Sequence, residues 1–297
     1  MIECFREVIV IQYVLLTMAV VFTAVNFLIS KIYQKCEGTT GERRLYFNAL
    51  VGLFTAIVVF FINGCKVEFT GYSFVMASIY NTLIMAYTIA GFKIMESGSM
   101  ALYMIFLMSG GMLVPYIWGI LFLDEAFSWF RFLGVVVISF GVALPNLTKE
   151  KVDKKQLLYC LFVFVLNGFT SVTSKVHQVE QTFPIVDTNS FVIMGNMFKF
   201  VFAAVLWMII KKKSGGQKKR NHYMLLIMLA SAVVSSFASM LQIGAATTVP
   251  ATVLYPFMTG GTVVFTSLAG VLFFKDKLSK KLVASIPLCF IGTLLFL

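Results

Sequence analysis

The chain has 297 residues, of which 59% are hydrophobic and only 12% are charged, and its mean hydropathy is +0.90. Soluble domains are roughly 45–50% apolar and about 25% charged, so this composition excludes a water-soluble globular protein. The formal net charge of +11 comes from basic residues gathered between apolar stretches, which argues against a nucleic-acid-binding surface.

Apolar windows follow one another along the whole chain, separated by short polar or glycine-containing breaks. A helix needs roughly 20 apolar residues to cross about 30 Å of hydrocarbon, because it rises about 1.5 Å per residue. The first window is too long for a signal-peptide core and is expected to be retained. The sequence therefore predicts an all-α polytopic membrane protein with ten transmembrane helices, at 8–32, 46–63, 72–92, 98–123, 130–147, 157–177, 189–210, 222–244, 251–274 and 282–297.

The basic residues predict the orientation of these helices. Most of the 24 lysines and arginines fall in the connections after the first, third, fifth, seventh and ninth windows. Lysine and arginine accumulate on the cytoplasmic side of membrane proteins. We therefore expect a multi-pass protein of the cell membrane with both termini outside, where the only basic residues are Arg6, Lys66, Arg131 and Lys175.

No residue pattern indicates catalysis or a bound cofactor. The five cysteines are scattered without CxxC spacing, and the two histidines lack a partner at metal-ligand spacing. Nucleophile motifs, phosphate-binding loops and channel filters are also absent from the sequence. The sequence therefore predicts a protein that is not an enzyme and that holds no metal or cofactor.

Comparison of the chain with itself indicates a duplication. The segment SKIYQ at 30–34 aligns with SKVHQ at 174–178, an offset of 144 residues. Further along, MSGG at 108–111 aligns with MTGG at 258–261, and LFLDEAFS at 121–128 aligns with LFFKDKLS at 272–279. The three matches are collinear and divide the chain into halves of five windows, 1–148 and 149–297. An odd number of helices per repeat places the second half upside down in the membrane.

These residues resemble a known family. The segment 121–128, followed by Gly134 and Gly141, is similar to the signature of the drug/metabolite transporter superfamily, EamA type, and 274–279 with Gly292 repeats it. The resemblance implies ten helices around a central cavity between two inverted halves, and export or exchange of amino acids, related metabolites or drugs. Its motifs do not specify the solute.

Lys199 is the sharpest single signal in the sequence. It lies near the middle of the window 189–210, where insertion scales assign a lysine roughly 2.5–3.5 kcal/mol. Such residues usually face a cavity or a partner, so Lys199 is a candidate for binding an anionic group of a solute. The alternative is a lysine whose ammonium reaches the membrane surface along a flexible stem.

Polar side chains at helical spacing supply the other candidate solute-binding residues. The first and sixth windows each carry a polar stripe, and repeat symmetry predicts that the stripes face each other across the pathway. The alternative is that these small polar residues serve close helix packing. The candidates are Asn26, Asn167 and Ser171 from the stripes, Gln242 in the eighth window, and Tyr80 and Asn81 in the third.

Four further residues are candidates for gating or ion coupling. Lys31, Lys175 and Gln178 belong to the duplicated SKxxQ segment, and Glu125 is the acidic residue of the family-like signature. The resulting prediction is a secondary transporter of a small organic metabolite, such as an amino acid or a related compound, acting by alternating access. Its partners would be the solute, the bilayer and a proton or counter-solute, with no nucleic acid, in a monomer or homodimer.

Two alternatives remain open at this point. The first is an exchanger of nucleotide sugars or phosphate esters from the same superfamily, in which Lys199 would contact phosphate. The second is a membrane subunit that binds a lipid headgroup without transporting it.

Overall fold

A computed structural model describes residues 2–38, 40–96, 100–144, 154–214, 223–274 and 280–296. Of these residues 89% are helical, and none of them forms a strand. The helices are α1 (Ile2–Glu37), α2 (Gly41–Ile62), α3 (Gly71–Glu96), α4 (Met100–Phe122), α5 (Trp129–Ala143), α6 (Lys154–Val179), α7 (Thr188–Ser214), α8 (Tyr223–Thr248), α9 (Ala251–Phe274) and α10 (Lys280–Leu294).

Eight of these helices are long and apolar enough to cross a membrane, as judged by length and composition. The exceptions are α5 and α10, which have 15 residues each. At about 1.5 Å per residue such a helix is shorter than a 30 Å hydrocarbon layer. The prediction of an all-α polytopic membrane protein is confirmed. The prediction of ten spans is not confirmed, because the described parts of α5 and α10 are too short.

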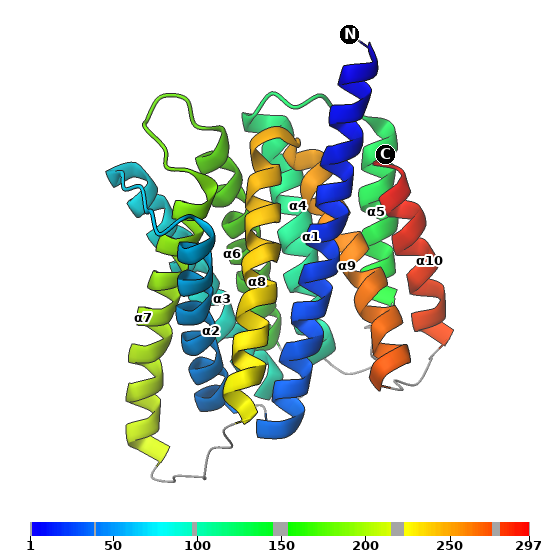
Figure 1. Cartoon of the computed structure of the whole chain (residues 1–297). Helices are drawn as coiled ribbons and strands as arrows, with labels where there is room; N and C mark the ends of the chain where they lie inside the picture. Colours follow the sequence, from blue (N-terminus) through cyan, green and yellow to red (C-terminus); the bar gives the residue numbers. More distant parts are fainter. Residues whose placement is uncertain are drawn as a thin grey trace.

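The helices run alternately up and down, and both termini lie at the same end of the molecule (Figure 1). We call this the upper end; it also carries the connections from α2 to α3, α4 to α5, α6 to α7 and α8 to α9. The described basic residues at the other, lower end include Lys35, Arg43, Lys93 and Lys211. The positive charge is therefore concentrated at the lower end.

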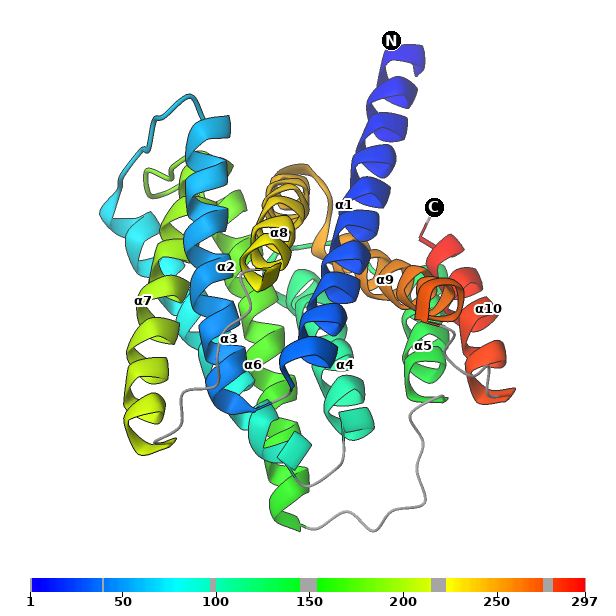
Figure 2. The same ribbon diagram turned by 60° about the horizontal axis from the view of Figure 1, so that its bottom comes forward.

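The helices form two groups joined through the middle of the bundle. Figure 2 shows α2, α3 and α7 on one side and α5, α9 and α10 on the other, with α1, α4, α6 and α8 between them. Helix α1 packs on α8 and α9, and α6 packs on α3 and α4. Helix α2 packs on α7 and α8, α3 packs on α7, α4 packs on α9, and α5 packs on α10.

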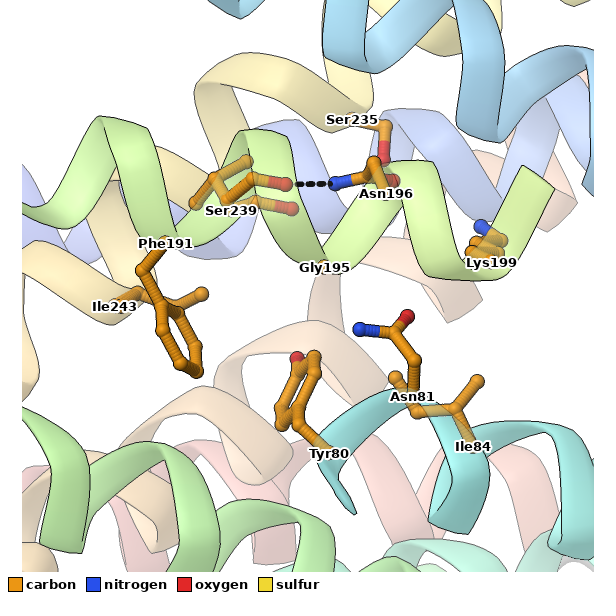
Figure 3. A pocket seen from close by; sticks show the side chains of 11 residues that line it. Tyr80, Asn81, Ile84, Phe191, Gly195, Asn196, Lys199, Ser235, Ser239 and Ile243 are labelled. Carbon is orange, nitrogen blue, oxygen red and sulfur yellow. Dashed lines mark hydrogen bonds between the residues drawn. The ribbon is translucent and has the colours of Figure 1, made fainter. Parts of the chain in front are cut away.

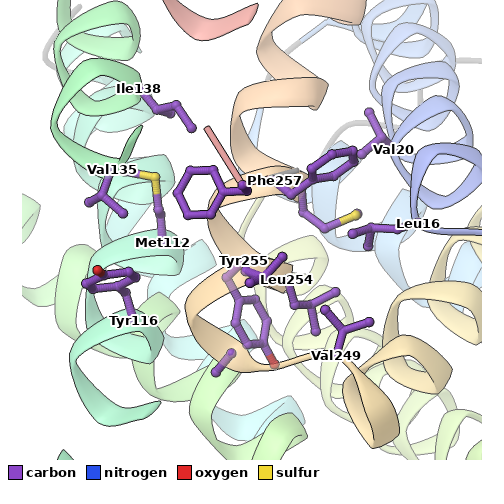
Figure 4. Close-up of a cluster of buried hydrophobic side chains, with 14 of the residues drawn as sticks. Leu16, Val20, Met112, Tyr116, Val135, Ile138, Val249, Leu254, Tyr255 and Phe257 are labelled. Carbon is purple, nitrogen blue, oxygen red and sulfur yellow. The ribbon is translucent and has the colours of Figure 1, made fainter. Parts of the chain in front are cut away.

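The largest apolar cluster surrounds α9 (Figure 4). Leu254 and Phe257 of α9 are buried there against Leu16 and Val20 of α1 and Met112 of α4. A helix that is apolar on all sides is buried within a bundle or a membrane. The first half of α9 is accordingly buried among helices from both halves of the chain.

The predicted glycine pairs mark close helix contacts. A Cβ atom on Gly110 of α4 would collide with the backbone carbonyl of Phe164 in α6. A Cβ atom on Gly261 of α9 would lie 2.9 Å from Val20 of α1. Small residues of this kind let helix backbones approach closely within a membrane. Both glycine pairs therefore serve helix packing, and α4 and α9 are unbroken around them.

Candidate functional site

A cavity of about 80 Å³, which we call the central cavity, lies between α3, α7 and α8. Side chains at helical spacing form its walls, because residues three or four apart share one face of a helix. The lining consists of Tyr80, Asn81 and Ile84 from α3, Phe191, Val192, Gly195, Asn196 and Lys199 from α7, and Ser235, Ser239 and Ile243 from α8 (Figure 3).

Lys199 supplies the charge of this cavity. The residue is half-buried near the middle of α7, next to the close approach of α2 at Gly52. In the parts of the chain that the structure describes, the Lys199 ammonium has no ion pair and no hydrogen-bond acceptor. No carboxylate is among the lining side chains. The cavity thus presents one cation among neutral dipoles.

Asn81 of α3 and Gly195 of α7 fit closely together in the cavity wall. The Asn81 side chain is 3% exposed, and its Nδ2 donates a hydrogen bond to the Ala77 carbonyl at 3.0 Å. Its amide nitrogen lies 2.8 Å from the place a Cβ atom on Gly195 would take. The amide oxygen of Asn81 is therefore left as an acceptor, and Figure 3 shows it on the side nearer Lys199.

The remaining polar groups of the lining are neutral. Asn196 donates its Nδ2 hydrogen to the Val192 carbonyl one turn earlier, at 2.9 Å. The Tyr80 ring meets the edge of the Phe191 ring, with centroids 5.9 Å apart. Amide, hydroxyl and phenol groups can replace part of a solute's hydration shell. Sequence reasoning missed Asn196, although it lies one turn before Lys199 on the same helix face.

Three of the predicted polar residues lie elsewhere. Asn26 of α1 accepts a 2.7 Å hydrogen bond from Ser231 of α8. Asn167 and Ser171 of α6 donate to the backbone of α4, at 2.7 Å and 3.3 Å. The two predicted stripes therefore do not face each other. The α1 residue bonds to α8 and the α6 residues bond to α4. These polar side chains therefore serve contacts between packed helices, as the alternative reading of the sequence expected.

In the eighth window, the structure places two serines at the cavity instead of the predicted Gln242. Gln242 is half-buried on α8 and is not among the residues that line the cavity. Ser235 and Ser239, which the sequence did not single out, do line it together with Ile243. Gln242 lies on the same side of α8 as Ser235, at the edge away from Ile243.

Two opposite charges hold the connection between α8 and α9. The buried Lys175 ammonium donates to the carbonyls of Ala246 and Val249, both at 2.8 Å, where α8 ends. The Glu125 carboxylate accepts from the N–H groups of Ala251 and Thr252, at 2.6 Å and 2.8 Å, where α9 begins. Cations suit the carbonyl end of a helix and anions its N–H end. We call these two side chains and their four hydrogen bonds the clamp.

The clamp lies at a hollow that opens at the upper end of the molecule. This hollow has a volume of about 620 Å³, and its lining includes Asp124, Glu125, Lys175, Glu180 and Pro250. We call it the upper hollow. The sequence predicted Lys175 and Glu125 separately, and the structure brings them to one connection.

A buried polar layer connects the segment beside the upper hollow with the lining of the central cavity. His177 is fully buried; its Nε2 lies 2.8 Å from the Ser73 hydroxyl, and its ring stacks on Phe191 of the cavity lining at 4.0 Å. Gln178 contacts His177 Nδ1 at 3.1 Å and accepts a hydrogen bond from Thr188 at 3.3 Å. The predicted gating residue Gln178 therefore lies in this layer, with His177, which the sequence did not single out.

Glu180 continues the network into the connection between α6 and α7. Its carboxylate accepts hydrogen bonds from the backbone of Thr182 at 2.6 Å and from the Tyr72 hydroxyl at 3.3 Å. The bond from the Thr182 backbone, with weaker help from Phe183 and Tyr72, holds the pKa of Glu180 below its ordinary value. This carboxylate therefore stays ionised at the rim of the upper hollow.

The other predicted sites lie at the lower end or outside the described residues. Lys31 lies towards the lower end of α1 and is not part of the cavity lining. The second copy of the family-like signature, at 275–279, lies outside the described residues, as does the boundary between the proposed halves. Among the residues described, no three His, Cys, Asp or Glu side chains lie together so that they could hold a metal ion.

Comparison with known proteins extends the description of the fold. No family model and no curated protein matches this chain. A solved structure described only as "Crystal structure of protein" is similar to it, with a TM-score of 0.73 and 13% sequence identity. The match covers 96% of this chain and 95% of that chain. The likeness is one of fold, and it extends over nearly the whole length of both chains.

Proposed function

We propose that this protein is a secondary transporter of a small organic metabolite, built like the EamA-type members of the drug/metabolite transporter superfamily. In this proposal all ten helices cross the membrane in two inverted halves, 1–148 and 149–297. The halves rock about the central cavity and expose it to one side of the membrane at a time.

The pattern of helix packing supports two related halves. If each helix is exchanged with the helix five places away in the other half, most of the extensive helix contacts are exchanged with one another or stay the same. The contact of α1 with α8 becomes that of α6 with α3, and the contact of α1 with α9 becomes that of α6 with α4. The contacts α2 with α7, α4 with α9 and α5 with α10 map onto themselves. A pseudo-two-fold axis relating inverted repeats predicts this pattern.

The aligned glycine segments lie in corresponding helix contacts. Gly111 and Gly261 hold the same place in MSGG and MTGG. A Cβ atom on Gly111 of α4 would lie 2.6 Å from Asn167 of α6, and one on Gly261 of α9 would lie 2.9 Å from Val20 of α1. The fourth helix of each proposed half therefore brings an aligned glycine against the first helix of the other half.

The observation that carries the proposal is the small polar cavity with its lysine, enclosed within apolar helices. An unpaired cation in the middle of such a bundle is costly and marks a solute or ion pathway more often than a structural role. The clamp and the buried layer beneath it close the upper end, so this conformation would communicate with the lower end. The clamp is then a gate that opens in the other half of the cycle.

Flux through purified protein in liposomes tests the proposal. Liposomes would be loaded with pools of amino acids, small carboxylic acids, nucleotides or organic cations, and release would be followed by mass spectrometry. We expect saturable flux of one class of solute. Ser239→Phe, which fills the cavity, would reduce that flux by at least about ten-fold, whereas the matched control Val233→Phe on the exposed face of α8 would not.

The other outcomes identify the rivals. Flux of nucleotides alone would indicate the phosphate-ester exchanger. Absence of flux from every pool, with protein that remains monodisperse and folded, would reject transport and favour the headgroup-binding membrane subunit.

A further inference from the structure

The charge balance of the central cavity limits which solutes can fill it. The lining holds one ammonium, from Lys199, together with the neutral groups of Tyr80, Asn81, Asn196, Ser235 and Ser239. In the described part of the chain no carboxylate faces this ammonium, and no backbone carbonyl accepts from it. A buried charge without a partner is unfavourable, and a solute that brings one negative charge removes that penalty.

Resting on the transporter function above, we propose that the cavity binds a small monoanion through a carboxylate group. We further propose that exchange of such anions across the membrane is faster than their net efflux without a counter-transported anion. The carboxylate accepts from Lys199, while amide and hydroxyl groups of the lining meet the rest of the solute. A zwitterion is disfavoured, because its ammonium would find no carboxylate among the lining residues. This narrows the metabolite class from amino acids to simple carboxylic acids.

The volume of the cavity sets the size of the solute. A cavity needs about 10–15 Å³ on this measure to hold one water molecule, so the observed 80 Å³ has room for about half a dozen. A short carboxylate with a hydroxyl or methyl group fits that space. A nucleotide sugar is much larger than this cavity and carries more negative charge than one lysine balances.

Exchange follows from the same charge count. When a monoanion is bound, the occluded cavity is neutral, and it can pass through the closed state without an unpaired charge. When it is empty, the occluded state encloses the Lys199 ammonium alone, so the return step is slow. The loaded carrier therefore passes through the occluded state faster than the empty one. Exchange of two anions is then faster than net transport of one.

Binding in detergent tests the solute class without requiring flux. The probes are lactate, its neutral isostere lactamide, and alanine as a zwitterion of similar size. We expect lactate to bind the wild type at least about ten-fold more tightly than either of the others, because both lack the net negative charge that Lys199 balances. Lys199→Gln removes this preference, whereas Lys211→Gln keeps it, since Lys211 is exposed at the end of the same helix over the Trp207 ring.

Transport in liposomes tests the exchange mode. Efflux of labelled lactate would be measured with and without unlabelled lactate outside. In the wild type, external lactate should accelerate efflux by at least about ten-fold. In Lys199→Gln and Lys199→Met, assayed at saturating solute, the acceleration should fall towards one, because the empty cavity no longer carries a charge.

Each contrary result has a separate meaning. Equal binding of lactate and lactamide by the wild type, or an unchanged preference in folded Lys199→Gln and Lys199→Met, overturns the carboxylate site. Tight binding of alanine overturns the restriction to monoanions. Efflux that external lactate does not accelerate overturns the exchange mode. Lys199-dependent lactate binding without flux of any solute would leave the anion site standing while rejecting the transporter function.

Discussion

At the scale of single residues, the contact between Gly195 and Asn81 is the part of the cavity wall most sensitive to change. The Asn81 amide is fixed by its bond to the Ala77 carbonyl and lies against the bare backbone of α7. Any side chain at position 195 must displace this amide, because the space for a Cβ atom is already filled.

We predict that Gly195→Ala lowers solute affinity by roughly ten-fold while leaving the protein folded, since the end of an asparagine side chain can shift where a backbone cannot. Affinity and thermal unfolding would be measured on the same preparation. In an Asn81→Ala background the second substitution should have little further effect on affinity. Additive losses in the double variant would show that Gly195 acts by another route.

The sequence predicted the charged residue of the cavity lining better than the amide side chains of the lining. Lys199 could be singled out because an ammonium in an apolar helix is costly wherever it points. Asn167 has no such constraint, since its amide is equally well satisfied by a neighbouring backbone carbonyl, and in the structure it bonds to Leu107. The roles of Asn196 and Ser239 depend on helix rotation, which the sequence pattern does not specify.

At the scale of helices, the contact between α4 and α6 depends on the absence of a side chain at Gly110. A Cβ atom there would overlap the Phe164 backbone, which belongs to a continuous helix and cannot move aside. Gly168 of α6 repeats the requirement from the other side, where a Cβ atom would lie 2.9 Å from the Gly110 carbonyl.

We predict that Gly110→Ala destabilises the protein by about 1–3 kcal/mol, the usual cost of overpacking. Thermal unfolding followed by size-exclusion chromatography would measure the loss. Gly244→Ala on α8 is the matched control, because its nearest neighbour is Thr188 at 4.0 Å. That variant should be unchanged or more stable by up to about 1 kcal/mol, since alanine is the better helix former. Equal stability of the two variants would contradict the close contact.

The helices themselves were largely predictable, and their lengths were less so. Hydropathy places each of the ten windows on one of the described helices, because an apolar run long enough to span hydrocarbon has few other structures available. The window 130–147 became the shorter helix Trp129–Ala143, and its remaining residues lie mostly outside the described part of the chain. The hydropathy of a window does not say where its last turn ends.

At the scale of the whole molecule, native cysteines offer a test of orientation. Cys36 and Cys65 are both exposed, the first near the lower end of α1 and the second after the upper end of α2. Cys160 and Cys289 are buried within helices. Of the four cysteines whose side chains the structure describes, one exposed thiol therefore lies near each end of the bundle.

We predict that, in a Cys4→Ser background, an impermeant maleimide added to intact cells labels Cys65 and spares Cys36. Cys36 should react only after the membrane is permeabilised, because we expect the basic lower end to face the cytoplasm. Cys36→Ser and Cys65→Ser variants identify which thiol carries the label. The reverse pattern would place both termini inside and contradict the orientation inferred from the basic residues.

The proposed duplication rests on three sequence matches, of which only part lies on described residues. The aligned glycines Gly111 and Gly261 lie in corresponding helix contacts, but the second acidic signature at 275–279 lies outside the described residues. Short matches between apolar helices arise easily, so the symmetric set of helix contacts is the stronger argument. Such contacts depend on three-dimensional packing, so comparing segments of the sequence could not predict them.

The clamp has a consequence for the kinetics of such a carrier. Its four hydrogen bonds join one connection to two side chains, so opening the upper end would break them together, not one at a time. Each charge-assisted bond is worth about 1.5–3 kcal/mol, yet water entering from the upper hollow would replace much of that in the open state. The clamp would then raise the barrier between two conformations of similar free energy. It would slow their interconversion without shifting the equilibrium between them.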